Sequence, residues 1–156
     1  MSFFDDIKTA VLALEPTATV LFDSLVRHEN ESFNYSSFPV VVVESGFNET
    51  SAKTGAGFIR TARQLTIDFL DSDTWDNRNN DNNDEQTEES SLDIILRMST
   101  LANSVLWRFL ETSDLTGGAN ENITFTKIPV YRSTSNNMTG VKIAFSYQYQ
   151  DTITCA

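Results

Sequence analysis

Hydrophobic residues recur at helical spacing near the start of the chain. Ser2 stands three positions before Asp5, a spacing typical of a capping box at a helix N-terminus, and Pro16 marks a stop. The apolar positions between them fall on one face of a helix: Phe3, Phe4, Ile7, Val11 and Leu14. The pattern predicts an amphipathic helix that ends before Pro16.

A second and longer helical pattern opens with Ser90 and Asp93 and continues to Gly117 and Gly118. Trp107 lies within it, and we expect its side chain to be partly in the core. The apolar positions that keep the i, i+3, i+4 spacing are Leu92, Ile95, Leu96, Leu101, Ala102, Val105, Leu106, Phe109 and Leu110. This is the strongest helix pattern in the sequence.

Between the two helices, the pattern changes to one typical of β-strands. Four consecutive valines, 40–43, follow Pro39 and predict a strand that is buried on both faces. Residues 17–22 are β-branched and apolar, and predict either a short strand or a further helical turn. Residues 46–57 are rich in Gly, Asn, Ser and Thr, and indicate a hairpin-type connection to a long strand ending near Leu70.

The C-terminal part of the chain has the clearest alternation. An apolar set is predicted to line one face of a strand: Val141, Ile143, Phe145, Tyr147, Tyr149 and Ile153. Before it, residues 123–131 read as a strand in which Pro129 indicates a sheet edge or a bulge. The order of elements predicts an α+β fold, a mostly antiparallel sheet with two helices packed on one face and a long acidic loop before the second helix.

The chain length indicates a single domain, and the charge distribution reveals one unusually acidic segment. A length of 156 residues, 40% of them hydrophobic, is typical of a single domain spanning 1–156. The net charge is -11, from 22 acidic against 11 basic residues. Between 71 and 89, eight acids stand against one base, Arg78, so this stretch holds seven of the excess negative charges. We therefore expect 71–90 to be a flexible acidic loop.

The acidity disfavours nucleic-acid phosphates and anionic membranes as direct partners. The lone cysteine, Cys155, allows no intrachain disulfide and fits assembly in a reducing cytosol. The acidic N-terminus is unlike a signal peptide, and no apolar run is long enough for a membrane span.

The sequence contains only weak matches to phosphate-binding, metal-binding and catalytic motifs. Residues 53–57 have the composition of a phosphate loop but the wrong order of glycines and lysine, and a strand follows them. A calcium loop with Asn77, Asn79, Asp81 and Glu88 would have asparagine at the first ligand position and Asn82 at the turn position that needs glycine. His28 is the only histidine, and the sequence has no GxSxG nucleophile elbow whose serine it could activate. We expect no enzyme activity, no cofactor and no metal site.

The remaining candidate residues are those of an interface between subunits or with a partner. Trp75 is an aromatic residue within the acidic stretch that the loop cannot bury alone, a composition found at interface hot spots. The basic residues lie mostly on predicted helices and strands, which suits head-to-tail association of an acidic loop with a basic face. The candidate interface residues are Trp75, Asp71, Asp73, Asp76, Asp81, Asp84, Glu85, Glu88, Glu89, Arg60 and Arg63.

This order of elements resembles the small tail-terminator, tail-completion and head–tail joining (neck) proteins of tailed bacteriophages. The segments that carry the resemblance are a helix ending at LEP, the strands FPVVVVES and RTARQLTIDFL, the helix LDIILRMSTLANSVLWRFL, and a final pair of strands ending in IAFSYQYQDTITC. The resemblance is one of pattern, without a diagnostic motif.

The resemblance implies a ring, hexameric or larger, at the neck or the tail end of a virion assembled in the host cytoplasm. Its partners would be copies of itself and portal, connector or tail-tube proteins, with DNA passing through without specific binding. An acidic loop that lines the bore would repel DNA over roughly 8 Å at physiological salt; otherwise the loop would contact a neighbouring ring. The alternative is a DNA-mimicking inhibitor of a nuclease or restriction enzyme, although its predicted helices carry few acids.

Overall fold

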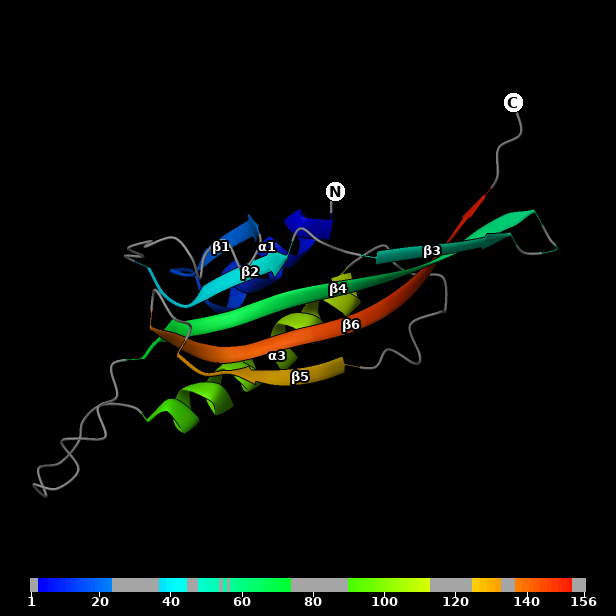
Figure 1. Cartoon of the computed structure of the whole chain (residues 1–156). Helices are drawn as coiled ribbons and strands as arrows, with labels where there is room; N and C mark the ends of the chain where they lie inside the picture. The colour runs from blue at the N-terminus through cyan, green and yellow to red at the C-terminus, as the bar shows by residue number, and fades with distance from the viewer. Residues whose placement is uncertain are drawn as a thin grey trace, which may run out of the picture.

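The computed structural model describes residues 3–23, 37–44, 48–53, 55, 57–73, 90–112, 125–132 and 137–152. In these ranges, two helices pack on one face of a six-stranded sheet, which confirms the α+β class expected from the sequence (Figure 1). Residues 71–73 were wrongly included in the expected flexible loop, since strand pairing continues through Ser72 and Asp73 is buried. Residues 74–89 lie outside the described ranges.

Helix α1 spans Phe3–Leu14 and helix α3 spans Ser91–Thr112. Ser90 caps α3 as predicted, because its Oγ donates to Asp93 Oδ2 at 2.7 Å and accepts from the Asp93 backbone N–H at 3.2 Å. Ser2, the predicted cap of α1, lies outside the described residues. Helix α1 ends just before Pro16, and the Glu15 N–H donates to the Val11 carbonyl at 2.8 Å.

The sheet contains β1 (Thr19–Asp23), β2 (Val40–Glu44), β3 (Asn48–Lys53), β4 (Phe58–Ser72), β5 (Phe125–Val130) and β6 (Met138–Thr152). Its order is β1-β2-β4-β6-β5, with β3 pairing to β4 beyond β2. Strand β1 runs parallel to β2, and all other pairs are antiparallel. Residues 17–22 therefore contribute a strand and no helical turn, and Pro129 lies on the edge strand β5.

The hairpin-type interpretation of residues 46–57 was correct in kind, but it was wrong to include 48–53 in the connection, because these residues form strand β3 of an antiparallel pair with β4. Every described side chain of β3, from Glu49 to Lys53, is exposed. With no buried face, β3 has no apolar alternation by which the sequence could reveal it. The strand forms through pairing with β4, in a register running from Asn48 opposite Gln64 to Lys53 opposite Ile59.

The main core lies between the helices and the sheet. Ile7 and Val11 of α1 and Val105 and Phe109 of α3 are completely buried against it. The sheet contributes alternate residues, among them Val41, Val43, Leu65, Ile67, Phe69, Val141, Ile143 and Phe145. The opposite face has a smaller buried cluster formed by Val40, Val42, Leu70 and Met138. The valine strand is thus buried on both faces, as its sequence predicted.

Three apolar residues of the predicted second helix are exposed. Trp107, expected to be partly buried, is 68% exposed, and Leu92 and Leu96 are 63% and 57% exposed. The core-facing residues of α3 are Ile94, Met98, Ala102, Val105, Leu106 and Phe109. Since α3 carries apolar residues on more than half of its circumference, spacing alone could not decide which of them face the sheet.

Strands β4 and β6 are 15 residues long and extend beyond the rest of the sheet. Strand β2 pairs with residues 67–70 of β4, and β5 pairs with residues 140–145 of β6. The outer part is a three-stranded arm that projects past both helices (Figure 1). We define the arm as 48–53, 58–64 and 146–152. In the described ranges, neither helix is long and apolar enough to cross a membrane.

Candidate functional site

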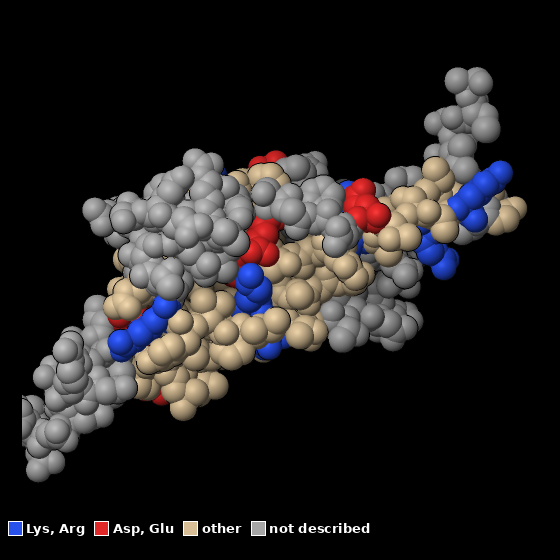
Figure 2. Space-filling model, in the orientation of Figure 1, with Lys and Arg blue, Asp and Glu red and all other residues tan. Residues whose placement is uncertain are grey.

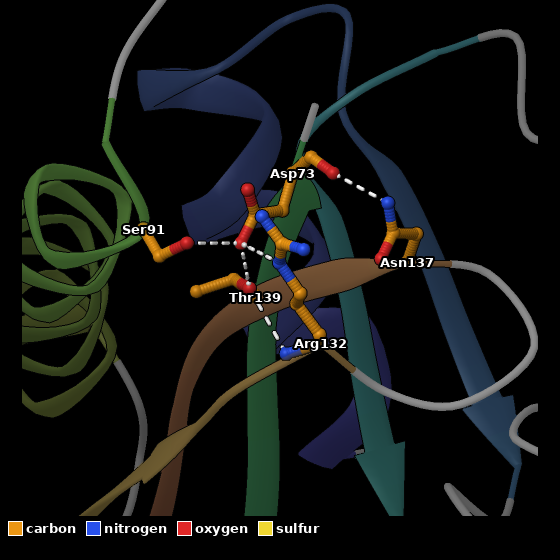
Figure 3. Close-up of polar contacts among 5 residues, drawn as sticks. All are labelled: Asp73, Ser91, Arg132, Asn137 and Thr139. Atoms are coloured by element: carbon orange, nitrogen blue, oxygen red, sulfur yellow. Dashed lines mark hydrogen bonds and ion pairs between the residues drawn. The ribbon is translucent and has the colours of Figure 1, made fainter. Parts of the chain in front are cut away.

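Asp73 is the centre of a buried polar cluster where β4 ends (Figure 3). Its side chain has no exposed surface, and Oδ2 accepts hydrogen bonds from Ser91 Oγ and Thr139 Oγ1, both at 2.6 Å. These donors come from the first residue of α3 and from β6. Hydrogen bonds to a charged acceptor are short and strong, and they offset much of the cost of burying a carboxylate.

Arg132 adds a cation to this cluster. Its Nε lies 3.5 Å from Asp73 Oδ2, and its backbone N–H donates to Thr139 Oγ1 at 3.1 Å. Arg132 has φ 42°, in the left-handed region that non-glycine residues seldom adopt. The guanidinium also lies 5.6 Å from the ring centroid of Tyr131, within cation–π range. These contacts favour the unusual backbone conformation of Arg132.

Asn137 connects the end of β4 to the start of β6. Its side-chain Nδ2 donates to the Asp73 carbonyl at 2.7 Å, and its own carbonyl accepts the Asp73 N–H at 2.9 Å. Its φ of 52° is common for asparagine, whose short polar side chain tolerates the left-handed region. The backbone of Asp73 is thereby fixed on both sides.

The cluster joins the two ends of the acidic segment. Asp73 precedes residues 74–89 and Ser91 follows them, yet the two side chains are in direct hydrogen-bond contact. Asp73, Ser91 and Thr139 are at most 7% exposed, so a substrate cannot reach the carboxylate or the hydroxyls. The arrangement is suited to holding the segment's ends together and is unsuited to acid–base or nucleophilic catalysis.

Asp71 lies at the same end of β4, in contact with α3. Its Oδ2 accepts from Arg97 Nη2 at 2.6 Å, with side chains 15% and 44% exposed. Surface ion pairs of this kind contribute up to about 1 kcal/mol. Of the predicted acidic interface, Asp71 and Asp73 thus form intramolecular contacts, and Asp73 is too buried to meet a partner.

Arg60 and Arg63, the predicted basic candidates, lie on the arm at the other end of β4. Arg63 forms an ion pair with Glu49 across the β3–β4 pairing. Arg60 and Lys53 are exposed, and among the residues that the structure describes neither forms an ion pair. Figure 2 shows basic side chains gathered at the outer end of the arm. The structure therefore places Arg60 and Arg63 on the arm and Asp71 and Asp73 at the other end of β4.

The other predicted interface residues lie outside the described ranges, as do the residues of the considered calcium loop. They are Trp75, Asp76, Asp81, Asp84, Glu85, Glu88 and Glu89. Within the described part of the chain, no three acidic, histidine or cysteine side chains group as metal ligands would.

Sequence reasoning missed a second charged cluster, on the sheet face away from the helices. Lys142 Nζ lies 3.3 Å from Glu44 Oε1 and 3.9 Å from Asp68 Oδ1, and Asp68 is completely buried. The alternation of β4 placed Asp68 opposite to the core face. Only the β4–β6 register, which pairs Asp68 with Lys142, could have identified its partner.

The sequence matches no protein-family model and no curated protein.

Proposed function

We propose that this chain is a structural subunit of a ring at the neck or the end of a phage tail. The ring would join the tail tube to the portal or connector and leave a channel for DNA. The proposal combines the sequence resemblance with one structural observation, the position of the exposed Lys53 and Arg60 on the arm, at the opposite end of β4 from residue 73, after which the acidic segment follows in the sequence.

The residue that precedes the acidic segment, Asp73, lies far from the basic residue Arg60 on the arm. Asp73 and Arg60 are separated by 13 positions along an extended strand, roughly 40 Å at about 3.3 Å per residue. This is several times the screening length of about 8 Å at physiological salt, so the two ends attract each other weakly within one chain. A neighbouring subunit can bring its acidic end directly to the arm.

Chain length adds to this argument. The described residues that flank the acidic segment are in contact, Ser91 with Asp73, so a chain of 16 residues between them could reach out no more than about 30 Å. Even pulled straight, it would end roughly 10 Å short of Arg60 of its own chain, and straightening it would cost conformational entropy. A head-to-tail contact between copies avoids this entropic cost, and repeated head-to-tail contacts close into a ring.

The arm also offers open strand edges. Among the described residues, β3 pairs with β4 alone, and residues 146–152 of β6 pair with β4 alone. Unpaired edges are sites where another chain can add a strand. The arm is therefore suited to contact a neighbour through backbone hydrogen bonds as well as through charge.

The test is the mass of the purified chain, measured by size-exclusion chromatography with light scattering at low and high salt. We expect a closed multiple of 17.5 kDa at low salt and partial dissociation at high salt. The double variant Lys53→Glu with Arg60→Glu should lose the ring. Asp76→Lys with Asp81→Lys in the same chain should restore it.

A matched control is Lys8→Glu, which reverses an exposed charge on α1, away from the arm. It should leave the mass unchanged. A monomer at every salt concentration, or a ring that survives the double arm substitution, contradicts the proposed mode of assembly. A monomer that blocks DNA cleavage by a nuclease would instead support the DNA-mimic alternative.

A further inference from the structure

The outward face of α3 carries an apolar stripe separate from the charged ends of the subunit. Leu92, Leu96 and Trp107 are 63%, 57% and 68% exposed. At 3.6 residues per turn, these three residues and the exposed Thr100 and Asn103 lie within an arc of about 80°. The same helix buries Met98 and Phe109 on its other side, so α3 has two apolar faces of which the sheet covers one.

A large apolar residue stands near each end of the stripe. Leu92 and Asp93 stand at its beginning, and Trp107 and Arg108 stand at its end. The midpoint between Leu92 and Trp107 falls beside Thr100, whose short side chain permits close approach of another helix. Large apolar groups thus lie eight residues before and seven residues after this small residue.

The two ends of the stripe carry opposite charges. Asp93 and Arg108 are both exposed, and helical geometry puts them on the same flank of the stripe. If a second α3 packed antiparallel about a two-fold axis, equivalent flanks would lie on the same side. Leu92 of each copy would then meet Trp107 of the other, and Asp93 would approach Arg108 within about one helical turn. Antiparallel helix dipoles would add to the attraction.

We propose that α3 is a docking surface for α3 of a second copy of this chain, in an antiparallel two-fold pair. Such a contact is isologous, so it differs from the head-to-tail contact that would form a ring. It joins two chains, or two rings face to face. A groove of about 450 Å³, lined by Leu14, Asn103, Ser104, Trp107 and Arg108, runs beside the stripe on the flank of Arg108. The partner's Asp93 would reach the rim of this groove.

Cross-linking at the proposed axis tests the pairing directly. Thr100→Cys in a Cys155→Ser background should form a disulfide-linked dimer of about 35 kDa, twice the chain mass of 17.5 kDa, under mild oxidation. Facing Cα atoms of helices packed 8–10 Å apart come within the roughly 4.4–6.8 Å that a disulfide requires. Thr126→Cys in the same background, at an exposed position on β5, is the control. Equal rates of cross-linking for both variants overturn the proposal.

Sedimentation equilibrium of the chain without added cysteines gives the second test. Leu96→Glu should weaken pairing at least about 10-fold, because it puts a carboxylate in the centre of the contact. Asp93→Arg alone and Arg108→Asp alone should each weaken it, whereas the two together should restore affinity to within about 3-fold. Circular dichroism verifies that α3 stays helical when Asp93→Arg removes the side-chain partner of the Ser90 cap.

The outcomes separate this proposal from the ring. Loss of the ring in the Lys53 and Arg60 double variant, with Thr100→Cys still cross-linking, supports both contacts independently. If pairing fails to respond to Leu96→Glu and the charge exchange gives no recovery, the α3 contact is wrong and the ring is unaffected.

Discussion

Replacement of Asp73 by alanine removes the acceptor at the centre of the buried cluster. Ser91 Oγ and Thr139 Oγ1 each lose a hydrogen bond of 2.6 Å, and the half-buried Arg132 loses its ion pair. Removing one partner of a buried, hydrogen-bonded charge pair costs about 3–5 kcal/mol. For a domain of this size, about 1 kcal/mol lowers Tm by about 2–4 °C, so we expect Tm to fall by roughly 6–20 °C.

The matched control is Asp71→Ala, the same substitution two positions earlier on β4. Asp71 pairs with the more exposed Arg97, so its loss should cost about 1 kcal/mol or less. Ser91→Ala should fall between the two, at about 1.5–3 kcal/mol, since it removes one hydrogen bond to a charged group. Thermal melts and urea titrations measure all three. Equal losses for Asp73→Ala and Asp71→Ala would refute the assignment of Asp73 as the centre of the cluster.

Two further predictions concern the sheet and the helices. A Cβ at Gly140 would lie 1.9 Å from the Phe69 carbonyl oxygen, so Gly140→Ala should lower the free energy of unfolding by at least about 1–3 kcal/mol. Urea titration measures this loss. An unchanged urea midpoint would contradict the close approach of β4 and β6 at this position. Phe109→Ala should cost about 3–5 kcal/mol, whereas Trp107→Ala should change stability by about 0.5 kcal/mol or less, because Phe109 is buried and Trp107 is exposed. Comparable losses for both would mean that the orientation of α3 is wrong.

The sequence predicted those elements in which burial follows a simple period. Val141, Ile143 and Phe145 alternate with polar or small residues, and β6 forms where they indicated, with all three buried. The side chains of Tyr147 and Tyr149 lie outside the part that is described. The capping box at Ser90 could also be predicted from the sequence, because its two partners are only three positions apart.

The elements missed by the sequence depend on distant partners. Strand β3 has no buried face, and only its pairing with β4 makes it a strand. Asp73 looked like one more loop acid, since its donors are 18 and 66 positions away in the chain. Trp107 was misjudged for a different reason, because the helical period permits several rotations of α3 and tertiary packing selects one.

The long pairing of β4 with β6 has a mechanical consequence. The register continues without interruption from Phe58 opposite Thr152 to Ser72 opposite Met138, so a single hydrogen-bonded ladder connects the arm to the Asp73 cluster. Bending this ladder sharply would break backbone hydrogen bonds, each contributing about 1 kcal/mol. The pair of strands should act as a stiff lever. Force applied to the arm would then be transmitted to the point where the acidic segment departs, and a molecule that holds one end would restrict the motion of the other.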